Sequence, residues 1–135
     1  MILGIDLGDS RTGFALSDAL NFTASTYETF KEKNIKKVML RAAEIANETK
    51  AEKIVLGYPK NMNGSIGERG KKSERFKKML EENVSVPVIL WDERLTTVSA
   101  HNLMNETNVR GKARKNSVDK IAAAFILQSY LDSLR

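Results

Sequence analysis

Three carboxylates stand where the surrounding sequence is otherwise apolar. Asp6 ends the short apolar run at the start of the chain, Glu93 follows the apolar segment VILW, and Asp119 lies early in a long apolar helical pattern. A buried carboxylate without a partner costs several kcal/mol or takes up a proton, and a nearby cation removes that cost. Carboxylates grouped without histidine or cysteine suit a hard divalent cation, Mg²⁺ or Mn²⁺. Two such ions about 4 Å apart are a common device for cleaving phosphodiesters.

Each acid also has a purely structural interpretation. Asp6 could cap a turn or bond to Arg11. Glu93 could pair with Arg94 at the surface, and Asp119 could complement the dipole of its helix. Taken together, the three acids favour one shared site. The carboxyl ends of parallel strands meet at one edge of a sheet, and a helix packed on that sheet can bring the third acid there.

Short apolar runs separated by turn residues predict the strands that must position these acids. Residues 2–8 and 13–18 predict a hairpin around the turn GDSR, and residues 23–30 could extend it into a meander. The all-apolar segments KIVLGYP and VILW predict buried strands at the centre of a sheet. The order of elements predicts an α/β protein with a mixed five-stranded sheet, in which helical crossovers join the parallel strands.

Apolar residues at helical spacing predict the helices that flank this sheet. The predicted helices cover residues 34–50, 73–83, 95–106 and 117–134. Asn34 is expected to cap the first helix, and Ser117 the last, so that Asp119 falls in its first turn. Segments 60–72 and 107–116, which contain glycine and many basic residues, are predicted to be loops.

Composition narrows the class of protein. The chain has 135 residues, a formal net charge of +5 and a pI of about 9.5, which favours polyanionic partners, chiefly nucleic acid. It contains no cysteine and one histidine, His101, which excludes disulfides, thiolate catalysis and a multi-histidine metal site. No apolar run reaches the ~18 residues of a membrane span, and no signal peptide is evident. We expect a single cytoplasmic domain, residues 1–135, without membrane association.

Basic segments are candidates for contact with phosphates. The segment 67–78 is diluted by glutamates and could equally be a solvated face. The segment 107–116 contains no acid and directly precedes Asp119, so its cations are the better candidates. These cations are Arg110, Lys112, Arg114 and Lys115. Arg11, in the first hairpin, could hold a phosphate through two hydrogen bonds or could neutralise Asp9. Binding through several of these cations should weaken steeply with salt.

Four stretches of the chain, taken in order, resemble one known family. They are GIDLGDSRTGFALSD, IVLGYPKNMNG, WDERLTT and DKIAAAFILQSYLD. Together they are similar to the YqgF family, also called RuvX, which comprises bacterial RNase H-like proteins described as Holliday junction resolvases and as nucleases that process pre-16S rRNA. The resemblance covers essentially the whole chain. It implies an RNase H-like fold and hydrolysis of phosphodiesters that depends on Mg²⁺ or Mn²⁺.

The resemblance also implies roles for individual residues. Asp6, Glu93 and Asp119 fall on the family's acidic positions, which implies that they are catalytic and hold the metal. Its other motif positions match Arg11, Gly57 and residues 94–97. One departure concerns the wider superfamily, in which many nucleases carry an acid at the end of the fourth strand. Here that strand ends LGYPKN, so that Glu93, one strand later, would have to substitute.

Functions other than nuclease activity on structured RNA are also compatible with parts of this sequence. Actin-like sugar kinases and ATPases also begin with an Asp-x-Gly hairpin, but they need a second domain for which 135 residues leave no room. A non-catalytic nucleic-acid-binding module would keep the fold without using the acids. A resolvase would act on branched DNA and would need a two-fold dimer. Processing of pre-16S rRNA in ribosome biogenesis is the preferred interpretation, and both a monomer and a homodimer fit the sequence.

Overall fold

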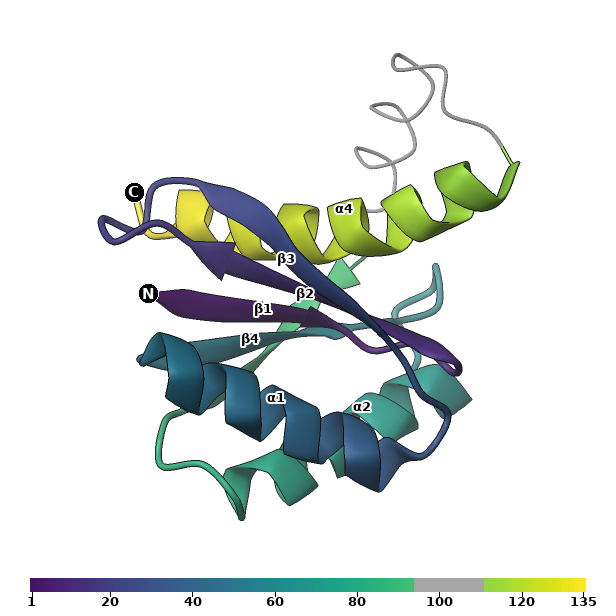
Figure 1. The fold of residues 1–135 in the computed structure, drawn as a ribbon. Helices are drawn as coiled ribbons and strands as arrows, with labels where there is room; N and C mark the ends of the chain where they lie inside the picture. Colours follow the sequence, from purple (N-terminus) through teal and green to yellow (C-terminus); the bar gives the residue numbers. More distant parts are fainter. Residues whose placement is uncertain (94–110) are drawn as a thin grey trace.

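One mixed sheet lies between two layers of helices (Figure 1). The structure, a computed structural model, describes residues 1–93, the backbone of residues 111–120, and residues 121–135 in full. The strands are β1 (Ile2–Asp6), β2 (Arg11–Ser17), β3 (Ala24–Lys31), β4 (Lys53–Tyr58) and β5 (Val88–Asp92). The helices are α1 (Ile35–Thr49), α2 (Glu68–Glu81) and α4 (Gly111–Ser133).

The strand order of the sheet is β3-β2-β1-β4-β5. β1 pairs with β2 in the antiparallel direction and with β4 in the parallel direction, and β4 pairs in parallel with β5. β2 and β3 complete the antiparallel meander. This confirms the predicted mixed five-stranded sheet. Because β1, β4 and β5 run the same way, their carboxyl ends meet at one edge.

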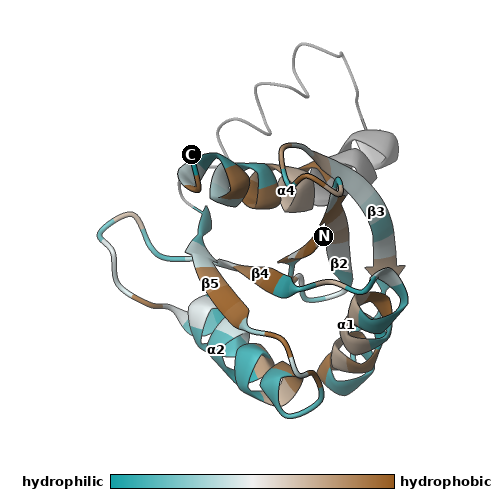
Figure 2. Cartoon of the chain, turned by 90° about the vertical axis from the view of Figure 1, so that its left-hand side faces the viewer, coloured by the Kyte–Doolittle hydropathy of each residue, from teal (hydrophilic) through white to brown (hydrophobic). Residues whose placement is uncertain are grey.

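Side chains alternate between the two faces of the sheet, and each face is covered by helices. Leu3 and Ile5 of β1 belong to the core beneath α1 and α2, whereas Ile2 belongs to the core beneath α4. A Cβ on Gly4 would lie 2.8 Å from the Cβ of Leu127, so α4 packs directly on β1. Hydrophobic residues colour much of β4 and β5 (Figure 2). β4 is buried and lies between β1 and β5, which confirms its predicted central position, whereas β5 is an edge strand whose side chains are mostly half-buried, so the prediction of a central strand at VILW is wrong. Within the described residues, no helix is both long and apolar enough to cross a membrane.

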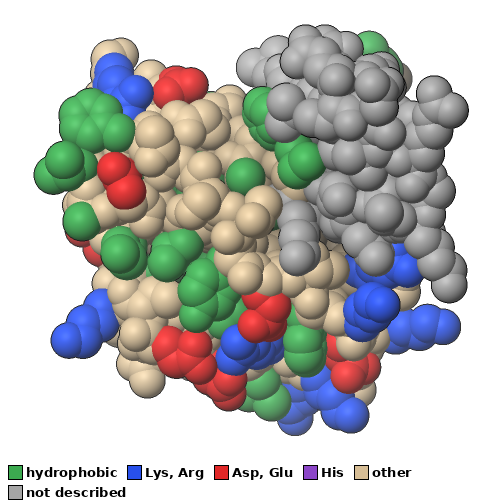
Figure 3. Space-filling view, turned by 45° about the horizontal axis from the view of Figure 1, so that its top comes forward, with side chains coloured by type: hydrophobic (Ala, Val, Ile, Leu, Met, Phe, Trp, Pro, Cys, Tyr) green, Lys and Arg blue, Asp and Glu red, His purple; other side chains and the backbone are tan. Residues whose placement is uncertain are grey.

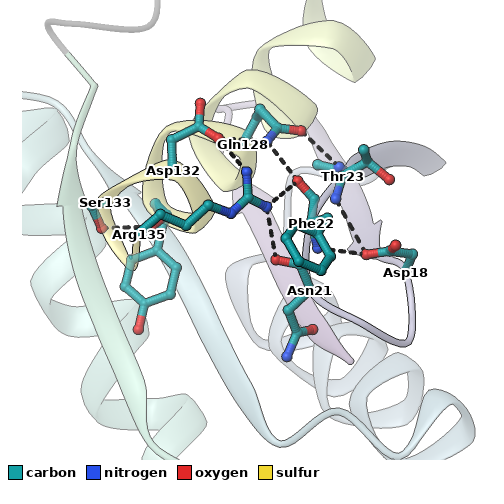
Figure 4. Close-up of polar contacts among 10 residues, drawn as sticks. Asp18, Asn21, Phe22, Thr23, Gln128, Asp132, Ser133 and Arg135 are labelled. Atoms are coloured by element: carbon teal, nitrogen blue, oxygen red, sulfur yellow. Dashed lines mark hydrogen bonds and ion pairs between the residues drawn. The ribbon is translucent and has the colours of Figure 1, made fainter.

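The carboxyl-terminal half of α4 is tied to the turn between β2 and β3 (Figure 4). The Gln128 amide donates to the carbonyl oxygen of Phe22 at 2.9 Å and accepts from the backbone N–H of Ala24 at 2.9 Å. The Arg135 guanidinium donates to the same Phe22 oxygen at 2.7 Å and lies over the Phe22 ring, 4.4 Å from its centroid. These contacts fix α4 across the sheet, so its amino-terminal half runs toward the carboxyl ends of the strands.

Two predicted helix boundaries are wrong. α2 begins at Glu68 rather than residue 73, and α4 begins at Gly111 rather than residue 117, so parts of both predicted basic loops are helical. Asp119 therefore lies about two turns inside α4 instead of in its first turn, and Ser117 is no N-cap. Lysine and arginine are good helix formers, so a basic composition did not exclude a helix.

The first helix agrees with its prediction. Asn34 is the N-cap of α1, and its side-chain oxygen accepts from the backbone N–H groups of Lys36 and Lys37 at 3.0 and 3.3 Å. The helix predicted over residues 95–106 lies outside the described residues.

Candidate active site

Asp6 and Glu93 form a hydrogen-bonded pair of carboxyls at the carboxyl edge of the sheet. Asp6 is the last residue of β1, and Glu93 directly follows β5. Burial raises the pKa of Asp6, and burial together with the neighbouring Asp6 charge raises the pKa of Glu93 to about 8. The pair therefore retains a proton at neutral pH. The structure thus brings together two of the three acids singled out in the sequence.

Gly57 of β4 provides the space that the Glu93 carboxylate occupies. A Cβ on Gly57 would lie 2.3 Å from Glu93 Oε1 and 2.8 Å from Ile126 Cδ1, both closer than non-bonded atoms approach. Because β4 lies between β1 and β5, Glu93 has to reach over β4 to meet Asp6. The missing side chain at position 57 opens that path. The Glu93 carboxylate therefore fills the volume that a side chain at the end of the fourth strand would take.

Asp119 lies on the part of α4 that approaches this edge. The carbonyl oxygen of Ala123 would be 3.3 Å from a Cβ on Gly4, and Leu127 contacts the same position. Asp119 precedes Ala123 by one helical turn and shares its stripe along the helix. Along that stripe, α4 continues from Gly4 toward the end of β1. The Asp119 side chain itself lies outside the described residues.

Arg11 begins β2 on the same face of the sheet as Asp6. Asp6 is paired with Gly13, and residues two apart on a strand share a face. A Cβ on Gly8 would lie 2.0 Å from the carbonyl oxygen of Arg11, so the tight turn between β1 and β2 requires glycine there. The turn thus returns Arg11 to the edge where Asp6 ends its strand.

The start of α2 adds cations that sequence reasoning did not select. Lys72 donates to the carbonyl oxygen of Gly8 at 3.4 Å and pairs with Asp9 at 3.2 Å. Arg69 is exposed, and its positive charge acts on both Asp6 and Glu93 to lower their pKa values, against the effect of burial. Asp9 therefore has a lysine partner from α2.

The basic residues before Asp119 fall in a different element from the one predicted. Lys112, Arg114 and Lys115 belong to the first turns of α4, and nothing of their side chains is described. Arg110 lies outside the described residues. Lys and Arg side chains also gather on the side of the molecule where Figure 1 places the start of α2 (Figure 3).

The described side chains contain no group of three or more histidine, aspartate and glutamate residues suited to a metal ion. Of the three acids predicted to hold a metal, Asp6 and Glu93 lie together, and Asp119 belongs to the part of α4 whose side chains are not described.

The raised carboxyl pKa of Glu93 predicts that metal-free protein loses stability as the pH rises. Between the ordinary value of 4.5 and about 8, the folded state binds more protons than the unfolded state, so the free energy of unfolding falls. We expect a loss on the order of 1 kcal/mol or more across this window. Urea unfolding in EDTA at several pH values measures it. Glu93→Gln should flatten this part of the profile, and an equally steep profile in that variant would contradict the assignment.

Comparison with known proteins identifies relatives over nearly the whole chain. A family model described as "RuvX: Holliday junction resolvase" matches residues 1–133. A protein of Bacillus licheniformis named "Putative pre-16S rRNA nuclease" is 48% identical over 135 residues, covering 98% of this chain and 97% of the relative. A protein of Bacillus subtilis with the same name is also 48% identical, covering 98% of both chains.

Solved structures share the fold at low sequence identity. The T. thermophilus RuvC in complex with a Holliday junction substrate superposes with a TM-score of 0.58 at 13% identity, covering 98% of this chain and 94% of RuvC. The Fowlpox virus resolvase in complex with Holliday junction DNA gives 0.58 at 17% identity, covering 98% and 97%. The predicted RNase H-like fold is confirmed. Together with the match to the family model, these findings show that the chain belongs to the RuvX family, also called YqgF.

Proposed function

We propose that this protein is a metal-dependent endonuclease that hydrolyses phosphodiester bonds in structured RNA, with precursor 16S rRNA as its substrate in the cytoplasm. The observation that carries the proposal is the Asp6–Glu93 pair, because two carboxyls meet at the edge where three parallel strands end. The name carried by the relatives at 48% identity supports the RNA substrate.

The chemistry of the pair fits a divalent cation. Its raised pKa values mean that two negative charges are not tolerated side by side without compensation, and a divalent cation would take the place of the shared proton. Carboxylate oxygens are the ligands that Mg²⁺ and Mn²⁺ prefer. Asp6, Glu93 and Asp119 would hold the cations. When bound, such ions activate a water for attack and stabilise the leaving oxygen.

The chain's own residues set the geometry of the reaction. The sheet holds Asp6 at a strand end, where its position is rigid. Glu93 reaches over Gly57 and thereby replaces the acid that many RNase H-like nucleases carry on the fourth strand. Arg11 binds a phosphate on the same face as Asp6. The basic residues before Asp119 contact phosphates farther along the substrate. They are Arg110, Lys112, Arg114 and Lys115.

Branched DNA is the second candidate substrate. The family description names Holliday junction resolvases, and both superposed structures contain junction DNA. A resolvase cutting two strands symmetrically would need a homodimer, whereas a monomer suffices for RNA. In a non-catalytic binding module, nothing would require two carboxyls to share a proton beneath α4.

The test compares two labelled substrates under defined metal conditions. The protein is incubated with a precursor 16S rRNA fragment or with a four-way DNA junction, in Mg²⁺, in Mn²⁺ or in EDTA. We expect cleavage of the RNA with either metal and none in EDTA. Linear duplexes of the same sequences control for branching. Cleavage of the junction alone would establish the second candidate, and cleavage of neither substrate would favour the binding module.

A further inference from the structure

The stripe of α2 that faces the core begins with an arginine. Residues 69, 73, 76 and 80 fall on one face of the helix, because they are spaced by three or four positions. Ser73, Phe76 and Leu80 are buried beneath the sheet, whereas Arg69 is exposed. The core-facing stripe of α2 therefore extends beyond the end of the sheet at Arg69. A cation on the core-facing side of a helix is expected only where the core has ended.

Two contacts hold the start of α2 between the strands that build the site. A Cβ on Gly70 would lie 2.9 Å from the carbonyl oxygen of Pro59, so the helix starts tightly against the chain that leaves β4. Lys72 donates to the carbonyl oxygen of Gly8, in the turn that follows Asp6. The first turn of α2 is thereby fixed at the ends of both β1 and β4.

The Arg69 side chain is not held in place by any residue that the structure describes. No hydrogen bond or ion pair joins its guanidinium to any described residue, although Lys72 and Lys77 of the same helix have such partners. Its charge nevertheless acts on both Asp6 and Glu93. The guanidinium thus lies within electrostatic reach of the acids, and none of its donors is used by a described residue.

We propose that Arg69 is a phosphate-binding residue of the candidate active site. Its guanidinium would hold the non-bridging oxygens of the phosphodiester that binds beside Asp6 and Glu93. This rests on the proposed nuclease function. Arginine suits the task, because its planar fork donates two parallel hydrogen bonds to phosphate oxygens. The guanidinium approaches around the end of the sheet, opposite the face on which α4 packs. A nucleic-acid strand entering the site would pass between the Arg69 guanidinium and α4.

Binding of a fluorescein-labelled RNA hairpin tests the proposal separately from cleavage. The parent protein carries Asp6→Asn, so that the RNA stays intact. Adding Arg69→Gln should weaken binding about 3–10-fold at low salt and reduce the slope of log affinity against log salt by about 0.7–0.9. Arg75→Gln is the matched control, because Arg75 is exposed on another side of the same helix. It should leave the affinity within about twofold of the parent.

A conservative variant distinguishes phosphate binding from a general effect of charge. Arg69→Lys should restore the salt slope, because the charge remains, but should cleave the RNA more slowly than wild type, because the fork is lost. Equal binding and equal slopes for the Arg69→Gln variant and its parent would overturn the proposal. Equal losses for Arg69→Gln and Arg75→Gln would also overturn it. Failure of the wild type to cleave RNA would contradict the nuclease function alone, since the binding comparison still reports on Arg69.

Discussion

Asp6→Asn is expected to lower the rate of RNA cleavage at least about 100-fold while the protein remains folded. Asparagine has nearly the shape of aspartate and can still hydrogen-bond to Glu93, but it carries no charge with which to hold a divalent cation. Removing one of two crowded carboxylates also relieves repulsion, so the metal-free variant should unfold at a temperature no lower than that of wild type at about pH 8. Single-turnover cleavage and thermal unfolding measure the two effects.

Asp9→Asn is the matched control for this variant. Asp9 lies three residues away in the same turn, is 83% exposed and pairs with Lys72 at the surface. Its replacement removes the same charge near the site but leaves the buried pair unchanged, and exposed ion pairs contribute little to stability. We expect the rate of cleavage to stay within a few-fold of wild type. Equal rates for the Asp6→Asn variant and wild type would rule out this carboxylate as a ligand.

Gly57→Ala is expected to reduce cleavage at least about tenfold with little loss of stability. The added methyl group would collide with Glu93 Oε1 and Ile126 Cδ1, which are the ends of flexible side chains and can move. Moving the Glu93 carboxylate away from Asp6 relieves the collision but disrupts the pair. A displacement of about 1 Å in a catalytic group can cost far more in rate than in folding energy.

Gly4→Ala provides the opposite result as a control. Its methyl group would meet the Cβ of Leu127 and the carbonyl oxygen of Ala123, which belong to the body of α4 and cannot turn aside. This variant should unfold at clearly lower urea concentration than Gly57→Ala, because the whole helix has to shift. If Gly57→Ala loses stability and activity in the same proportion as Gly4→Ala, glycine at position 57 serves packing rather than the placement of Glu93.

The strands and the nearness of Asp6 and Glu93 were predictable from the sequence for a physical reason. Strands buried on both faces appear as unbroken apolar runs, and the helical pattern between them forces parallel crossovers. Once β1 and β5 are parallel, their final residues must share an edge. Local patterns thus imply this long-range contact without any information on side-chain packing.

The space above Gly57 and the position of Arg69 were not predictable in this way. The sequence shows that residue 57 has no side chain, but only packing shows that the carboxylate at the end of the neighbouring strand β5 uses the space. Arg69 was missed because the helix was predicted to begin at Ser73. That boundary left Arg69 outside the helix and therefore off its core-facing stripe. Segment 67–78 contains both acids and bases, and charge pattern alone does not separate the cation at the site from those in solvent.

The position of β5 has a consequence for how activity responds to temperature. β5 is the last strand of the sheet, paired only with β4, and the carboxyl that it carries is delivered across that neighbour. Edge elements detach more readily than central ones, often well before the whole domain melts. Fraying of β5 alone would separate Glu93 from Asp6 while the hairpin of β1 and β2 stays intact. Warming should therefore switch the enzyme off reversibly at temperatures where most of its backbone is still native.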